Sequence, residues 1–145
     1  MGVQKYFNEA GKLQITNAIR VAETNTSGEI RVHIEKHCDG DVLDRAAYIF
    51  AKLEMHKTEL RNGVLFYLAV EDKKFAILGD GGINQKVADD FWENTKEVVI
   101  AKLKEAKYAE ALADGIIMAG EQLKAHFPYQ NDDVNELSDE ISFGK

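Results

Sequence analysis

Apolar and polar residues follow two different periods along this chain, and each period predicts a type of secondary structure. Over residues 8–24 the apolar positions recur every three or four residues, which predicts an amphipathic helix. Residues 29–36 alternate strictly between polar and apolar side chains, as in a strand with one polar face. Residues 63–70 are almost wholly apolar, which is typical of a strand that is covered on both faces.

Turn and capping residues mark the elements between these segments. Asp41 is a natural N-cap for a helix over 42–56, because its carboxylate can accept hydrogen bonds from the free amides of the first turn. A short polar turn leads from the strand 63–70 into a second strand over 74–79, so the two predict an antiparallel hairpin.

Two helices are predicted between Gly82 and Pro128. Apolar positions at helical spacing run from 91 to 103 in the first and from 108 to 123 in the second. Gly115 and Gly120 weaken the second helix, and we interpret them as places where another element packs closely.

The order of these elements predicts an α/β fold. A helix connects the first two strands, so these strands should be parallel with a right-handed crossover. The remaining helices must cover both faces of the sheet. We therefore expect a three-layer αβα sandwich built on a small mixed β-sheet of three to four strands.

The chain is expected to form one domain over residues 1–128. Residues 129–145 are acidic and show no sustained period, which predicts a disordered tail. An acidic tail of this kind suggests an adaptor function, in which the tail binds a basic protein partner.

Charge and composition exclude several classes of function. The 145 residues carry a net charge of −7, which argues against nucleic acid or an anionic membrane surface as a partner. A single cysteine, Cys38, allows neither an internal disulfide nor a cysteine-based zinc site. The four histidines lack metal-binding spacing and are expected at the surface or at caps. The absence of an apolar signal core or a long apolar run predicts a cytoplasmic protein.

Strand directions place a candidate metal site at the turn 79–82, Gly-Asp-Gly-Gly. Asp80 is expected beside the start of the first strand, which carries Glu29, and beside the connection 57–62, which carries Glu59 and Asn62. Carboxylates, amides and main-chain carbonyls are the oxygen ligands that Ca²⁺ prefers. A cation would also relieve the repulsion among the three acids. We therefore predict that one or two divalent cations, with Ca²⁺ favoured, bind at Asp80, Glu29, Glu59 and Asn62.

A structural interpretation of the same turn stays open: Asp80 forms an Asx turn and the glycines supply positive φ. A second acidic group, Asp39 and Asp41, is expected at the opposite end of the sheet. It lacks the glycine and the glutamate that complete an EF-hand loop, and capping already explains Asp41.

Four segments together resemble the TPM domain family, which includes thylakoid-lumen proteins of photosystem II repair and many bacterial proteins. The segments are 26–32 (TSGEIRV), 61–65 (RNGVL), 75–83 (FAILGDGGI) and 108–112 (YAEAL). The resemblance implies an αβα sandwich, an acid-phosphatase-like activity in some members and divalent-cation binding in others. This chain shows neither the export signal nor the C-terminal membrane helix that members usually carry, and it has Asp80 in the glycine turn.

These observations leave three functions open. The first is a stand-alone TPM domain that binds Ca²⁺ as a regulatory module. The second is a metal-dependent, acid-phosphatase-like hydrolase, which rests on the resemblance alone because no nucleophile or general base stands out and the catalytic residues are unknown. The third is the adaptor that acts through its acidic tail.

Overall fold

The computed structural model describes residues 2–129 and 136–144. In these residues the helices and strands follow the predicted order, with two short helices, η1 and α3, and a short strand, β4, added. The elements are η1 (Gly2–Lys5), α1 (Glu9–Asn25), β1 (Glu29–Glu35), α2 (Val42–Lys52), β2 (Gly63–Ala69), β3 (Lys74–Gly79), α3 (Gly81–Asn84), α4 (Glu93–Lys104), α5 (Tyr108–Leu123) and β4 (Ser142–Phe143).

The sheet is mixed and has four strands in the order β3-β2-β1-β4. The parallel pairing of β1 with β2 is as predicted, and its register sets Glu29 opposite Gly63. The predicted antiparallel hairpin of β2 and β3 is also confirmed. Because β2 lies between β1 and β3, its side chains are buried on both faces, which explains its unbroken run of apolar residues.

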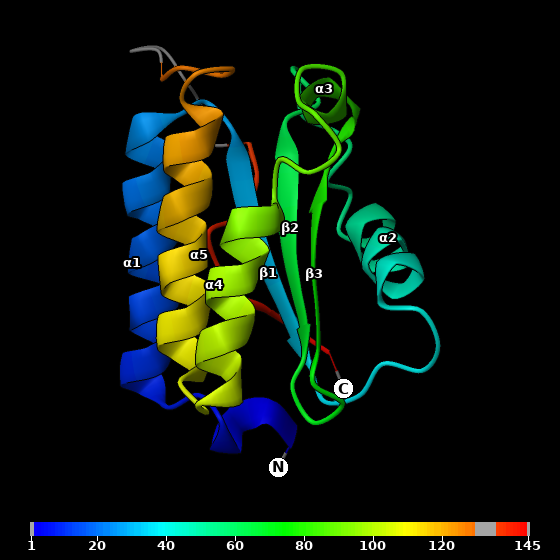
Figure 1. Cartoon of the computed structure of the whole chain (residues 1–145), viewed down its shortest axis with the longest axis vertical. Coiled ribbons are helices and arrows are strands. Elements are labelled where there is room, and N and C mark those ends of the chain that lie inside the picture. The colour runs from blue at the N-terminus through cyan, green and yellow to red at the C-terminus, as the bar shows by residue number, and fades with distance from the viewer. Residues whose placement is uncertain (1, 130–135, 145) are drawn as a thin grey trace.

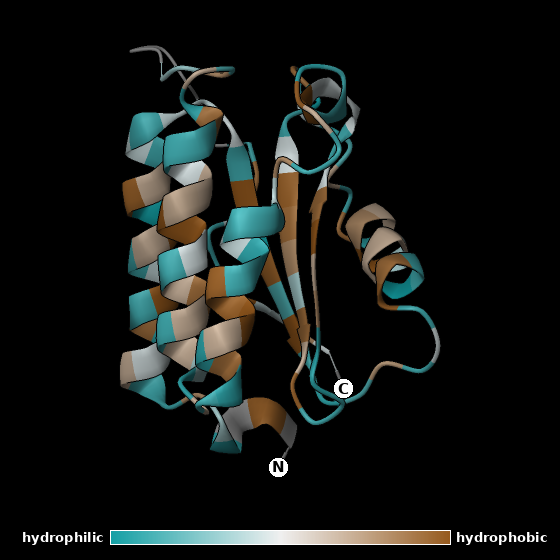
Figure 2. Ribbon diagram, in the orientation of Figure 1, coloured by the Kyte–Doolittle hydropathy of each residue, from teal (hydrophilic) through white to brown (hydrophobic). Residues whose placement is uncertain are grey.

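The three layers of the predicted αβα sandwich are clear in Figure 1. Helices α1, α4 and α5 lie on one side of the sheet and α2 lies on the other. Figure 2 shows that β2 and β3 are mostly apolar and that the long helices around the sheet carry both apolar and hydrophilic residues. The hydrophobic core is correspondingly split into a larger cluster under α1, α4 and α5 and a smaller one under α2.

Two predictions about local structure are confirmed. The Asp41 carboxylate accepts a hydrogen bond from the amide of Asp44 at 3.0 Å, so it caps α2 as expected. Gly115 and Gly120 stand where helices meet: a Cβ on Gly115 would lie 2.4 Å from a Val99 methyl carbon, and one on Gly120 would lie 2.7 Å from the Cβ of Ala22. The close packing expected of these glycines is therefore real.

The end of the chain differs from the prediction. Residues 129–145 were expected to be disordered, but the described residues 136–144 pack along β1. Ser142 and Phe143 pair with His33 and Ile34 to form β4. The tail residues 130–135 and 145 lie outside the described residues, and the predicted domain boundary at 128 stays a prediction.

Candidate functional site

The end of the sheet where β1 and β2 begin carries Asp80, as the strand directions predict. β3 ends at Gly79, and Asp80 is the N-cap of the short helix α3. The amide of Asp80 donates to the Gly63 carbonyl at 2.9 Å, which fixes its backbone to the first residue of β2. Its carboxylate accepts from the amide of Gly81 at 2.7 Å. Asp80 is thus held from both sides and is 6% exposed.

Gly82 in this turn serves close approach rather than positive φ. A Cβ on Gly82 would lie 2.2 Å from the Leu60 carbonyl oxygen and 2.6 Å from the Arg61 carbonyl oxygen. Among the described glycines Gly40 alone has a positive φ, whereas Arg61 itself has a φ of 52°. The expectation that the turn glycines supply positive φ is therefore wrong, because the left-handed residue lies on the neighbouring connection.

Arg61 is the direct partner of Asp80. Its Nε and Nη2 donate to the two carboxylate oxygens at 2.8 Å each, in a bidentate pair. The Asp80 side chain is 5% exposed and that of Arg61 is 55% exposed. Burial alone would raise the pKa of Asp80, but Arg61 and the Gly81 amide hold that pKa below its usual value. The carboxylate is therefore ionised, and its counter-charge is a side chain that reaches water.

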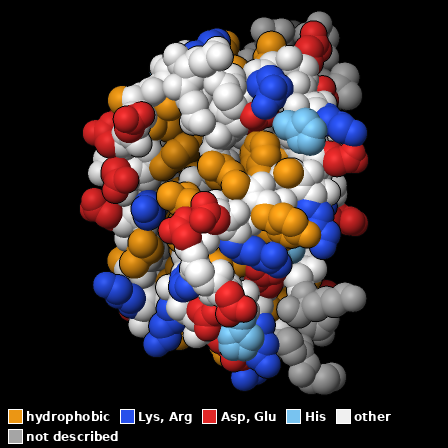
Figure 3. Space-filling model, turned by 90° about the vertical axis from the view of Figure 1, so that its right-hand side faces the viewer, with side chains coloured by type: hydrophobic (Ala, Val, Ile, Leu, Met, Phe, Trp, Pro, Cys, Tyr) orange, Lys and Arg blue, Asp and Glu red, His pale blue; other side chains and the backbone are white. Residues whose placement is uncertain are grey.

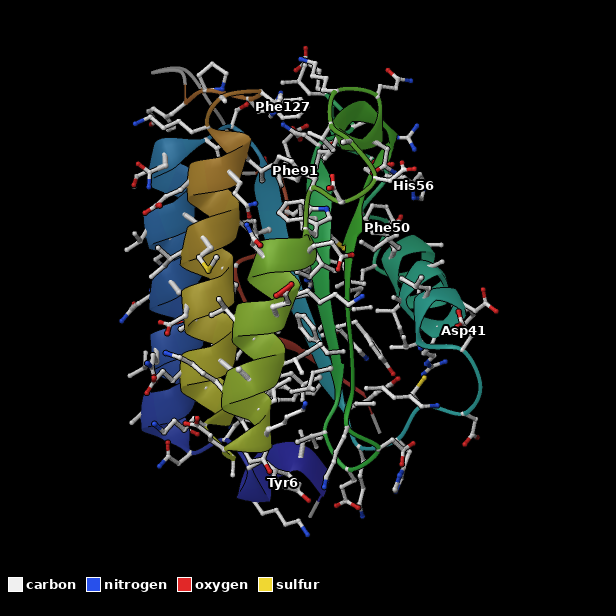
Figure 4. All side chains as sticks on the ribbon, in the orientation of Figure 1. Tyr6, Asp41, Phe50, His56, Phe91 and Phe127 are labelled. Atoms are coloured by element: carbon white, nitrogen blue, oxygen red, sulfur yellow. The ribbon has the colours of Figure 1, made fainter. Side chains whose placement is uncertain are left out.

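A shallow hollow of about 360 Å³ opens beside this ion pair, and both Asp80 and Arg61 line it. His56 and Asn84 line it as well. The Asn84 amide nitrogen donates to the Gly79 carbonyl at 3.1 Å, which leaves its side-chain oxygen as a potential ligand. Figure 4 shows His56 at the end of the molecule where α3 lies, and Asp41 at the far end of α2. The two acidic groups are thus separated, as predicted.

The other predicted ligands have different surroundings from Asp80. The Glu29 carboxylate accepts hydrogen bonds from the amides of Glu136 and Leu137 at 2.9–3.1 Å. The Asn62 amide nitrogen donates to the Ser27 carbonyl at 3.0 Å, and its oxygen is buried without a partner in the described residues. Glu59 is exposed, and its amide donates to the Glu136 carboxylate.

The described residues around Asp80 do not form a preformed cluster of metal-binding side chains. Within residues 2–129 and 136–144 no group of three or more His, Cys, Asp or Glu side chains is placed to hold a metal ion. Glu29, Glu59, Asn62 and Asp80 therefore stay predicted ligands. The other polar side chains that line the hollow with Asp80 are those of Arg61, His56 and Asn84.

Protonation lowers the negative charge of the acidic side chains around Glu29. Burial is the main cause that raises the pKa of Glu29, although the amides of Glu136 and Leu137 oppose it. Burial, followed by a hydrogen bond with Asp139, raises the pKa of Glu23 to about 9. Glu23 is therefore protonated at neutral pH, which removes its repulsion with Glu29 and Asp139.

A second polar cluster lies under α2 and was missed by the sequence analysis. Glu35 is 2% exposed, and its carboxylate accepts a bidentate pair from Arg45 at 2.8 and 2.9 Å. The Tyr67 hydroxyl donates to the same carboxylate, and His33 Nε2 lies 3.3 Å from it. The other ring nitrogen of His33 lies 2.8 Å from the Ser142 hydroxyl. His33 is 5% exposed, so the expectation of surface histidines is wrong at this position.

The protonation states of this cluster are settled by its own contacts. Burial would raise the pKa of Glu35, but the hydrogen bonds from Arg45, Tyr67 and His33 lower it to about 2. Burial lowers the pKa of His33 and raises the pKa of Tyr67. At neutral pH the cluster thus holds one carboxylate, one guanidinium and two neutral rings, an arrangement that joins α2, β1, β2 and β4.

Comparison with known proteins finds a family and two solved structures that are similar to most of the chain. A family model described as the TPM domain matches residues 3–122. The solution structure of the BA42 protein from the psychrophilic bacterium Bizionia argentinensis is 48% identical, with a TM-score of 0.90 and 95% of each chain covered. The N-terminal domain of the cg2496 protein from Corynebacterium glutamicum shares the fold at 14% identity, with a TM-score of 0.62 over 96% of this chain and 80% of that one.

A search among curated proteins gave no match. No helix within the described residues combines the length and the apolar character that crossing a membrane requires.

Proposed function

The chain belongs to the TPM domain family, and we propose that it is a divalent-cation-binding module of that family. Ca²⁺ is the proposed ion and Asp80 its first ligand. The observation that carries the proposal is a buried, ionised carboxylate at the edge of a hollow, balanced by a single exposed side chain.

The residues around Asp80 fit a small oxygen-ligand site. Asp80 supplies a carboxylate, and Asn84 supplies an amide oxygen that is not used in its hydrogen bond to Gly79. Glycines bring main-chain carbonyls of the 57–62 connection close to α3, as the contact of Gly82 with Leu60 shows. Ca²⁺ accepts carboxylate, amide and carbonyl oxygens together.

Arg61 sets the strength of this site, because its guanidinium and a cation compete for the same two oxygens. Arg61 is more than half exposed, so it can leave Asp80 and remain hydrated. Sites with few charged ligands bind Ca²⁺ weakly, with dissociation constants of about 10⁻⁴–10⁻³ M. We place this site in that range.

Thermal unfolding with and without Ca²⁺ tests the proposal. For a dissociation constant of about 10⁻⁴ M, about 10 mM Ca²⁺ should stabilise the protein by about 2.7 kcal/mol. For a domain of this size that corresponds to a rise in Tm of roughly 5–10 °C. Asp80→Asn should abolish the rise. An exposed acid at the other end of the sheet provides a matched control, so Asp39→Asn should keep the rise in full.

Arg61→Gln separates cation binding from loss of the ion pair. Without the guanidinium the metal-free protein should melt lower, because Asp80 loses its counter-charge. The Ca²⁺-dependent rise should become larger, since the competitor is gone. A rise that is equal in wild type and Asp80→Asn, or that disappears in Arg61→Gln, contradicts the proposal.

The same variants examine the hydrolase alternative. The cluster around Glu35 is buried and its charges are paired, so it supplies no free nucleophile. Ca²⁺-dependent hydrolysis of a chromogenic phosphate ester that is lost in Asp80→Asn would assign the hydrolase function to the Asp80 site. Ca²⁺ binding without turnover supports the binding module.

A further inference from the structure

A pocket of about 430 Å³ lies at the opposite end of the sheet from Asp80. It opens between the β2–β3 hairpin and the end of α4, which lie beside each other at the lower end of Figure 1. Leu68, Val70 and Phe75 form its floor, and each is less than 8% exposed. Its volume falls within the range of roughly 300–1,000 Å³ that is usual for small-molecule sites.

The walls of this pocket are apolar and come from the helical layer. Ile100 and Leu103 from α4 and Tyr108 from the start of α5 line it, and all three are partly exposed. Partly exposed apolar side chains around a buried apolar floor offer surface that an apolar ligand can cover.

Both charged side chains among the described lining residues are lysines, Lys73 and Lys104. The charged side chains at this pocket are therefore both positive, although the chain as a whole has a net charge of −7. Within the part of the chain that the structure describes, neither lysine has an ion-pair partner.

The acids next to Lys73 in the hairpin turn are engaged by other groups. Glu71 lies 3.6 Å from the Lys5 ammonium and 3.8 Å from His37. The Asp72 carboxylate lies 3.1 Å from the ring of His37 and accepts the amide of Cys38. Their contacts are therefore on the side of the turn that faces the N-terminal segment and the end of β1.

The acids near Lys104 are also occupied. Glu105 pairs with Lys107 at 3.2 Å, and Glu110 pairs with Lys102 at 2.7 Å. The positive charge of Lys104 and Lys73 is therefore left to balance a charge that the described residues do not provide.

We propose that this pocket binds a soluble organic anion with an apolar body and a single carboxylate head, such as a medium-chain fatty acid. The apolar body lies on the floor of Leu68, Val70 and Phe75. The carboxylate lies between Lys73 and Lys104. The site is separate from Asp80 and does not depend on cation binding there.

Titration of the full chain with octanoate, followed by amide and methyl NMR signals, tests the proposal. Saturable shifts should centre on the hairpin and on the last turn of α4. The neutral analogue 1-octanol should bind about tenfold more weakly, because it lacks the charge that the two exposed lysines attract. In the double variant Lys73→Gln/Lys104→Gln, octanoate and octanol should bind equally.

Two further variants control the experiment. Lys124 is an exposed lysine just beyond the other end of α5, about 24 Å from Tyr108 at 1.5 Å per residue. Lys124→Gln should keep the preference for octanoate. Ala106 is exposed and lines the pocket, so Ala106→Trp should block binding of both ligands without disturbing the core.

Several results would overturn the proposal: no saturable shifts, shifts outside the pocket, or a preference for octanoate that survives the double lysine variant. A membrane lipid is the other source of an anionic head with an apolar tail. Sedimentation with phosphatidylglycerol vesicles in the absence of octanoate binding would assign the pocket to a membrane surface and contradict a soluble ligand.

Discussion

Glu35 is ionised at a buried position because three side chains donate to it. Arg45, Tyr67 and His33 supply hydrogen bonds that outweigh the cost of burial and bring its pKa to about 2. Asp80 follows the same rule with fewer partners, since Arg61 and one amide stabilise its charge. The two ion pairs differ in how far the arginine is exposed to solvent: the Arg61 side chain is 55% exposed, and that of Arg45 is 37% exposed. We therefore assign a structural role to Glu35 and a binding role to Asp80.

The variant Glu35→Gln should lower the free energy of unfolding by about 2–3 kcal/mol, because an amide group faces the donors of Arg45 and leaves them unpaired. Glu9, whose side chain is 89% exposed, provides the control. Glu9→Gln should change stability by less than about 0.5 kcal/mol. Urea unfolding at neutral pH measures both.

The pH dependence gives an independent check of the same carboxylate. The pKa of Glu35 is lower in the folded protein than in the unfolded chain, so its stabilisation is complete above about pH 4.5 and is lost as the pH falls toward 2. Wild type should therefore lose stability over this interval more steeply than Glu35→Gln. Parallel pH profiles would contradict the assignment.

At the scale of elements, close helix packing is what the sequence analysis predicted best. The glycines of α5 signalled contact, and α1 and α4 are found where Gly120 and Gly115 have no side chain. Helix α2 ends at Lys52, earlier than the predicted 56, and Glu54 just beyond it has a φ of 57°. Apolar spacing continues past this point, so the pattern alone does not reveal the end of the helix. The outer face of α2 keeps exposed apolar side chains, visible among charged ones in Figure 3.

Gly120→Ala should destabilise the protein by about 1–2 kcal/mol. The added methyl group would lie 2.8 Å from the Cα of Ala22, and such overpacking outweighs the gain in helix propensity. Gly81, where a Cβ meets nothing within 4 Å, is the matched position, and Gly81→Ala should be nearly neutral. Equal urea midpoints for the two variants would show that α1 and α5 are not in close contact.

At the scale of the whole molecule, the C-terminal segment completes the sheet. Glu136 and Leu137 donate their amides to Glu29, and β4 covers the free edge of β1 beside His33. The acidic composition of this segment predicted disorder, because composition does not record that Leu137 is 9% exposed or that the amides have a buried acceptor. For the same reason the sequence did not reveal that these two amides donate to Glu29.

The sequence likewise did not predict which side chains pair at the Asp80 site and in the cluster around Glu35. Strand directions correctly placed the 57–62 connection beside Asp80, but the residues selected there were Glu59 and Asn62 and not Arg61. His33 and Glu35 share one strand face in the pattern, but Arg45 and Tyr67 reach them from other elements. Hydrogen-bond partners across elements depend on register and helix rotation, which hydrophobic periodicity leaves undetermined.

Deletion of residues 130–145 should lower the free energy of unfolding by about 3 kcal/mol, because it removes the burial of Leu137 and two hydrogen bonds to Glu29. Urea unfolding of the full-length and shortened chains measures this difference. Unchanged stability would mean that the segment is an independent tail, which is the arrangement the adaptor hypothesis requires.

The most direct test of the proposed function is a Ca²⁺ titration followed by amide NMR signals. We predict saturable shifts at Arg61 and over 79–84, with a dissociation constant of about 10⁻⁴–10⁻³ M, and their complete loss in Asp80→Asn. Signals of the Glu35 cluster should not move. Absence of saturable shifts, or shifts that centre on Glu29 and persist in Asp80→Asn, would contradict a cation site at Asp80.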